Sequence, residues 1–243
     1  MPNGPLSPPD LANTVTSFCT ILAGATALLF CRFVGPQPAR WRFAYGCLFL
    51  TGLPTFGWHG FGTPLLQVLD IGSNLLLAWA LQWAVLGDFY APATRRRVGV
   101  ASGVANALMV LWMIADALAG RDRLAVEFAG FGGFYPGELL LILDSVLVVA
   151  LIYARRGLIP EAARPLLHVV TLTFLAGLGL ATASGETVHW RWVSYHALWH
   201  VVGAFGFVVL WAFNHVRFGK APHCRGAARG ESAPGLLDPR RRP

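Results

Sequence analysis

Long apolar runs separated by short polar connectors cover most of the chain. A helix needs about 20 mostly apolar residues to cross a bilayer. Seven segments meet this requirement, at roughly 14–34, 42–59, 64–86, 98–119, 138–155, 165–184 and 193–216. The connectors between them hold most of the proline, glycine and charge. The pattern predicts an all-α integral membrane protein, built as a bundle of seven transmembrane helices.

The same pattern divides the chain into three parts. Residues 1–13 form an N-terminal outer segment, and residues 14–216 form the seven-helix membrane domain. The first ten residues lack the basic n-region of a cleavable signal peptide, so we expect the first span to be retained. Residues 217–243 are rich in Arg, Gly and Pro, and we expect a disordered, basic, cytoplasmic tail.

Basic residues predict the orientation, because cytoplasmic connectors carry an excess of Lys and Arg. With the N-terminus outside and the C-terminus inside, nine arginines fall in the inner connectors and seven basic residues in the tail, which makes sixteen of nineteen. One lysine against eighteen arginines is typical of a GC-rich bacterial genome. We therefore expect a multi-pass protein of the bacterial inner membrane.

Composition excludes several classes of protein. Hydrophobic residues make up 55% of the chain and charged residues only 13%, about half the share found in soluble domains. A soluble enzyme, a secreted disulfide scaffold and a nucleic-acid-binding protein therefore fit poorly. The four cysteines show no paired spacing, so neither a disulfide framework nor a cysteine metal site is indicated.

Ionisable residues inside the spans are costly and need a partner, a cavity or a function. His196 and His200 are four residues apart, which puts both imidazoles on one helix face, as two ligands of one metal require. Two merely hydrogen-bonded histidines are the alternative. His59 ends the second span, and Thr55 lies one turn deeper on the same face. A threonine there often bonds only to its own backbone.

Asp70 lies about two turns into the third span, which contains no basic residue to neutralise it. Gln67 adds a polar group one turn before it. Asp70, His196 and His200 all fall on the order of 5–10 Å below the outer surface, with His59 close to it. Three neutral imidazoles with an open fourth position are typical of catalytic zinc. The spacing thus predicts a zinc site that faces the outer side.

Thr55-x-x-x-His59, Gln67-x-x-Asp70 and His196-Ala-Leu-Trp-His200 resemble the motifs of the alkaline ceramidases. This family belongs to a superfamily of seven-span membrane hydrolases that includes the adiponectin/progestin receptors. The resemblance covers the span count and the motif order. It implies that His59, His196 and His200 bind Zn²⁺, that Asp70 is the general base for the attacking water, and that Thr55 stabilises the oxyanion. It further implies hydrolysis of the N-acyl bond of a ceramide-like lipid, which yields a fatty acid and a sphingoid base.

The chain departs from that family at two places. Thr55 stands where the family has serine, and the added methyl group narrows the pocket. The family's acidic N-terminal calcium cluster is reduced to Asp10 and Asn13, so calcium dependence is not expected. The expected partners are the lipid substrate and the membrane.

Asp144 lies deeper in the fifth span, and with Gln67 it is a candidate to hydrogen-bond the outer ring nitrogen of a zinc ligand. The main functional alternative is a seven-span lipid-binding or receptor-like protein with a non-catalytic zinc. Two further alternatives are a haem carrier that uses histidines on facing helices and a metal transporter.

Overall fold

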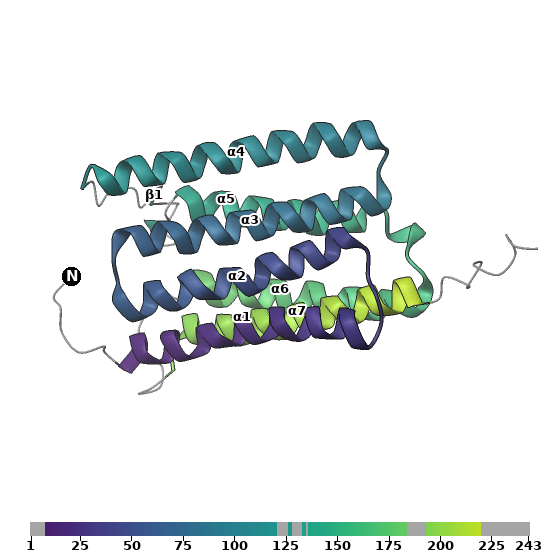
Figure 1. The fold of residues 1–243 in the computed structure, drawn as a ribbon, viewed down its shortest axis with the longest axis horizontal. Coiled ribbons are helices and arrows are strands. Elements are labelled where there is room, and N and C mark those ends of the chain that lie inside the picture. Colours follow the sequence, from purple (N-terminus) through teal and green to yellow (C-terminus); the bar gives the residue numbers. More distant parts are fainter. Residues whose placement is uncertain (1–7, 121–125, 128–132, 135, 184–192, 220–243) are drawn as a thin grey trace, which may run out of the picture.

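The computed structural model is a bundle of long helices that lie side by side along one axis (Figure 1). It describes residues 8–120, 126–127, 133–134, 136–183 and 193–219. The long helices of this part are α1 (Pro8–Phe33), α2 (Ala39–Phe61), α3 (Pro64–Phe89), α4 (Pro92–Leu118), α5 (Pro136–Tyr153), α6 (Arg164–Ala183) and α7 (Tyr195–Gly219). Two 3₁₀ turns, η1 (Arg156–Leu158) and η2 (Glu161–Ala163), join α5 to α6. The two-residue strands β1 (Val126–Glu127) and β2 (Gly133–Phe134) pair antiparallel.

Among the described residues, six helices are long and apolar enough to cross a membrane, namely α1 from Leu11, α3, α4, α5, α6 and α7. Helix α2 has 23 residues, a comparable length. It is more polar because it contains Arg40, Arg42, Pro54 and His59. The chain thus has the helices of a multi-pass membrane protein, as predicted, while the seventh span and the orientation stay predictions.

Helix α2 lies between α1 and α3 and supplies many of the buried side chains. The α1–α2 contact is close because glycines face the neighbouring backbone. A Cβ atom on Gly24 would clash with the backbone nitrogen of Phe49. Small residues allow this close approach between helices in a membrane. Helix α1 also packs on α7, which places the N-terminal helix against the last one.

Helix α4 touches the bundle along one narrow stripe. Its buried residues are Gly99, Asn106 and Met113, which are seven residues apart. Leu108 and Leu111 on the other face are more than half exposed. An exposed apolar face on a helix of this length is what a lipid environment accommodates.

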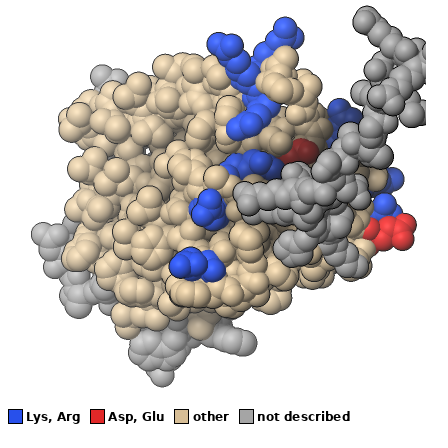
Figure 2. All heavy atoms as spheres, turned by 45° about the vertical axis from the view of Figure 1, so that its right-hand side comes forward, with Lys and Arg blue, Asp and Glu red and all other residues tan. Residues whose placement is uncertain are grey.

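Arginines gather at one end of the bundle, where α2, α4 and α6 begin and α1, α3, α5 and α7 end. Figure 2 turns this end towards the reader and shows the basic side chains in blue. The alternation of the helices thus brings the basic residues of the predicted inner connectors to a single end. The predicted site residues lie near the opposite helix ends.

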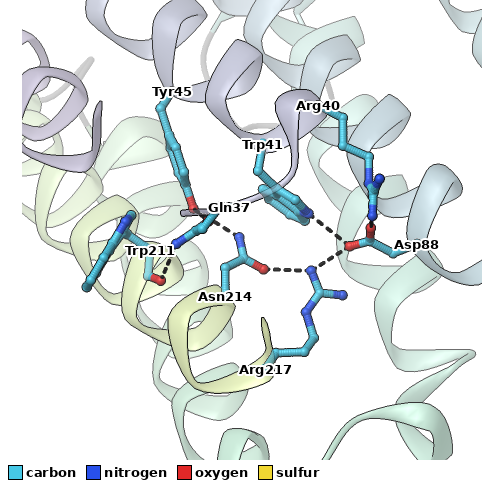
Figure 3. A network of polar contacts seen from close by, with 8 residues as sticks. All are labelled: Gln37, Arg40, Trp41, Tyr45, Asp88, Trp211, Asn214 and Arg217. Atoms are coloured by element: carbon cyan, nitrogen blue, oxygen red, sulfur yellow. Dashed lines mark hydrogen bonds and ion pairs between the residues drawn. The ribbon is translucent and has the colours of Figure 1, made fainter. Parts of the chain in front are cut away.

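A buried polar network ties α2, α3 and α7 together at the basic end (Figure 3). The Asp88 carboxylate pairs with Arg40, accepts a hydrogen bond of 2.8 Å from Trp41 Nε1 and one of 2.5 Å from Arg217 Nη2. The side chains of Asp88 and Arg217 are only 3% and 6% exposed. Asn214 links Arg217 to the Tyr45 hydroxyl.

The last helix is longer than predicted, and it ends beside this network. We predicted the tail to begin at Arg217, whereas α7 continues to Gly219. The reason is the Asp88 carboxylate, which gives the Arg217 guanidinium a partner inside the bundle. A buried charge with a paired, hydrogen-bonded partner is tolerated where a lone one is not.

Candidate metal centre

Three histidines converge at the end of the bundle opposite the arginines. His59 lies in the last turn of α2, and His196 and His200 lie in the first two turns of α7. One ring nitrogen from each lies within 4.8 Å of the other two. The Nε2 atoms of His59 and His196 are 3.0 Å apart, and the ring centroids of the three are 4.7–5.2 Å apart. The predicted convergence of the three imidazoles is thus observed.

A tight connection between α2 and α3 positions the first ligand. Helix α2 ends at Phe61 and is followed by Gly62, which has φ 65° and donates its N–H to the carbonyl of Trp58. Glycine adopts this left-handed conformation without a steric penalty, which stops the helix within one residue. Thr63 then caps α3, and Pro64 occupies its first turn. His59 and Asp70 are thereby held on adjacent helices at the same end.

Side-chain hydrogen bonds fix the start of α7. Ser194 Oγ accepts from the backbone N–H of Ala197 at 2.9 Å, which caps the helix. The same hydroxyl donates to Asn13 Oδ1 on α1 at 2.5 Å. The first turn of α7, with its two histidines, is therefore anchored to α1.

Thr16 contacts one ring nitrogen of His200 and leaves the other free of it. Thr16 Oγ1 lies 3.0 Å from His200 Nδ1 and 2.8 Å from the carbonyl oxygen of Ala12. With its one proton directed to the Ala12 carbonyl, the hydroxyl can accept from His200 Nδ1–H. Nε2 then carries the lone pair. It is buried and has no hydrogen-bond partner among the described residues.

The donor set fits a metal ion such as zinc. Buried polar atoms normally have partners, so the unpaired Nε2 of His200 indicates a ligand. Two nitrogens that bind one tetrahedral zinc at 2.0–2.1 Å lie about 3.3 Å apart, close to the 3.0 Å between His59 and His196. A metal-binding histidine usually has its second ring nitrogen held by a neighbouring group, as Nδ1 of His200 contacts Thr16. The group of three could therefore hold one ion.

Asp70 and Thr55 form a pair one helical turn from His59. Thr55 Oγ1 lies 2.5 Å from Asp70 Oδ1 and 2.8 Å from the carbonyl oxygen of Thr51. Asn74 Nδ2 donates to the same Asp70 oxygen at 3.2 Å. Gln67 is half-buried on α3, one turn before Asp70. The contact between Thr55 and Asp70 goes beyond the bond to its own backbone that we had weighed for Thr55.

The structure places Asp144 in a different polar cluster, between α3, α4 and α5. Its Oδ2 accepts from Asn106 Nδ2 at 2.7 Å, and its Oδ1 lies 3.5 Å from Ser102 Oγ. Gln82 Nε2 donates to its backbone oxygen at 3.3 Å. These contacts satisfy a carboxylate that α4 and α5 bury between them. They give no support to the predicted role of Asp144 beside a zinc ligand.

Sequence reasoning missed two residues of the site. Thr16 holds His200 across 184 positions of sequence, and Asn74 bonds Asp70 from the next turn of α3. Asn74 could have been found from the sequence, because it lies four residues after Asp70 and therefore on the same face of α3. Thr16 offers only a hydroxyl in an apolar span, one turn after Asn13.

No family model matches the chain, and no curated protein matches it. The arrangement of the side chains and the motifs themselves therefore carry the functional proposal.

Proposed function

We propose that the chain is a zinc-dependent membrane amidase that hydrolyses the N-acyl bond of ceramide-like lipids to a fatty acid and a sphingoid base. The observation that carries this proposal is the buried, unpaired Nε2 of His200 beside His59 and His196, with the Asp70–Thr55 pair one turn away. A structural site needs only ligands. A carboxylate and a hydroxyl in addition are the groups that hydrolysis requires.

His59, His196 and His200 would hold the ion through one nitrogen each. When bound, zinc lowers the pKa of a water molecule to about 7 and polarises a carbonyl group, which supplies the nucleophile that an amide needs. The hydrogen bond from His200 Nδ1 to Thr16 keeps the ring in the tautomer whose Nε2 can bind. Three protein ligands would leave room on the ion for water and substrate.

Asp70 is the proposed general base. Thr55 and Asn74 both contact its Oδ1, so Oδ2 has no hydrogen bond among the described residues. That oxygen can accept a proton from the attacking water and pass it to the leaving nitrogen. Asn74 also bonds the backbone oxygen of Asp70 at 3.0 Å, which orients the carboxylate during both transfers.

Thr55 is the proposed donor to the oxyanion. Its proton is directed to Asp70 or to the Thr51 carbonyl in this structure. Rotation about one bond redirects it towards a substrate carbonyl. A hydroxyl donor at such a position typically contributes about 2.7–4 kcal/mol to transition-state stabilisation.

A lipid substrate is favoured by the surface around the site. Phe61, Leu65 and Leu69 are 73%, 53% and 48% exposed at the ends of α2 and α3. Leu69 directly precedes Asp70. Acyl chains can pack against these side chains while the polar amide reaches the histidines near the helix ends.

The test compares Asp70→Asn with the wild type by fatty-acid release from a panel of ceramides and other N-acyl lipids. We expect the variant to keep its zinc and to lose release by at least about 100-fold, because the base contributes that much. Asp116→Asn, at the same end on α4, is the matched control and should keep its activity. Zinc in the wild type without release from any lipid would instead favour a lipid-binding or receptor-like protein.

A further inference from the structure

A cavity of about 360 Å³ opens at the basic end of the bundle, between α5 and α6. It is lined by Tyr153, Arg156, Gly157, Arg164, Leu167 and His168. Small-molecule sites begin at about 300 Å³, so the cavity has room for one compact polar group. It lies at the opposite end from the three histidines and has no role in the proposed hydrolysis.

Buried apolar residues hold the segment beside the cavity in place. Ile159, Ala163 and Leu167 are at most 2% exposed and pack into the core cluster. The two 3₁₀ turns are thereby fixed against the bundle. Across the cavity, the Tyr153 hydroxyl lies 3.0 Å from His168 Nδ1. This contact joins the end of α5 to the first turns of α6.

The lining carries two positive charges that the protein hardly compensates. The Arg156 side chain has no hydrogen bond or ion pair among the described residues. Arg164 Nε donates to the Ile159 carbonyl at 3.2 Å, which orients its guanidinium. Its ion pair with Glu161 is 3.6 Å long, and the Glu161 side chain is 88% exposed. Such an exposed ion pair contributes little free energy. The two guanidinium groups are therefore available to an anion.

Arginine binds phosphate through two parallel hydrogen bonds. The neighbouring surface of α6 indicates where such a phosphate comes from. Val169 and Leu172 are 38% and 65% exposed just beyond His168. An apolar face that continues from a basic cavity at a membrane boundary suits the acyl chains of a lipid. Basic pockets between membrane helices bind anionic headgroups elsewhere.

We propose that this cavity binds the phosphate of an anionic phospholipid, with Arg156 and Arg164 as its cationic ligands and the Tyr153–His168 pair beside them. The acyl chains lie along the exposed face of α6. The site anchors the basic end of the bundle in a leaflet that contains anionic lipid. This inference does not depend on the proposed hydrolysis.

The test is native mass spectrometry of the detergent-purified protein titrated with palmitoyl-oleoyl phosphatidylglycerol or with the corresponding phosphatidylcholine. The double variant Arg156→Gln/Arg164→Gln should lower the affinity for the first bound phosphatidylglycerol molecule by about tenfold or more, because two charge-assisted contacts are lost. The matched control is Arg96→Gln/Arg97→Gln, which removes the same charge from exposed positions at the same end. It should change the affinity by less than about threefold.

Three results would overturn the proposal. Equal losses in both double variants would mean that only the overall surface charge matters. Equal binding of phosphatidylcholine would mean an apolar crevice, and competition by millimolar inorganic phosphate would mean a site for free phosphate. Arg156→Gln alone is a second variant that loses no described contact. It should fold normally and still weaken phosphatidylglycerol binding.

Discussion

Thr16 on α1 and His200 on α7 are 184 positions apart, and their side chains are joined by a contact of 3.0 Å between Oγ1 and Nδ1. The first helix therefore contacts one of the three clustered histidines, which lies on the last helix. The contact leaves Nε2 of the His200 ring for the other two histidines, and it makes α1 part of the candidate metal centre.

Replacement of Thr16 by valine should weaken zinc binding by about 10- to 100-fold, because partners of the outer ring nitrogen typically contribute that much. Thr16→Ser keeps the hydroxyl and should restore the affinity. The measurement is competition with a chelator of known affinity. The control is Thr171→Val on α6, whose hydroxyl bonds the Leu167 carbonyl and no other group among the described residues. Equal affinities of Thr16→Val and Thr171→Val would contradict the positioning role.

Thr55→Val should lower kcat on the best N-acyl lipid by about 10²- to 10³-fold, the usual effect of a lost oxyanion donor. KM and zinc content should change little, since the hydroxyl contacts neither the ligands nor the acyl chains. Thr55→Ser should stay within a few-fold of the wild type. Thr51→Val is the control, since Thr51 bonds the Cys47 and Ser73 carbonyls one turn away. A comparable loss of kcat in Thr51→Val would point to a packing effect.

At the basic end of the bundle, Asp88→Asn should lower the free energy of unfolding by about 3–5 kcal/mol. The variant leaves the buried Arg217 guanidinium without its carboxylate partner. The thermal midpoint in a fixed detergent reports the change. The control Glu161→Gln removes a carboxylate from an exposed pair and should cost less than about 0.5 kcal/mol. If both variants unfold at the wild-type midpoint, the Asp88 network does not stabilise the bundle.

The helices were largely predictable because the thickness of the bilayer sets the length of an apolar segment that crosses it. The predicted spans match the seven long helices to within a few residues, with larger differences at the starts of α1 and α4. Helix α4 begins at Pro92, six residues before the predicted 98. Proline at a first helical position is favoured, whereas an apolar window ignores the polar turn that follows it.

The convergence of His59, His196 and His200 was also predictable, from spacing and depth along each helix. The direction in which a side chain points around the bundle was not. Asp144 has the depth of a buried functional group, yet it bonds Asn106 and Ser102. Arg217 appeared to start a polar tail because its partner, Asp88, is 129 positions away. Such pairs depend on which helices are neighbours, which hydropathy does not report.

The most direct test of the central claim is the zinc content of the purified protein by elemental analysis, for the wild type, His200→Ala and His215→Ala. His215 lies on the same helix but stacks on Trp211 at the basic end, so it is a matched control. We predict about one zinc per chain in the wild type and in His215→Ala, and almost none in His200→Ala. A wild type without zinc, or a His200→Ala variant that keeps it, would contradict the metal centre.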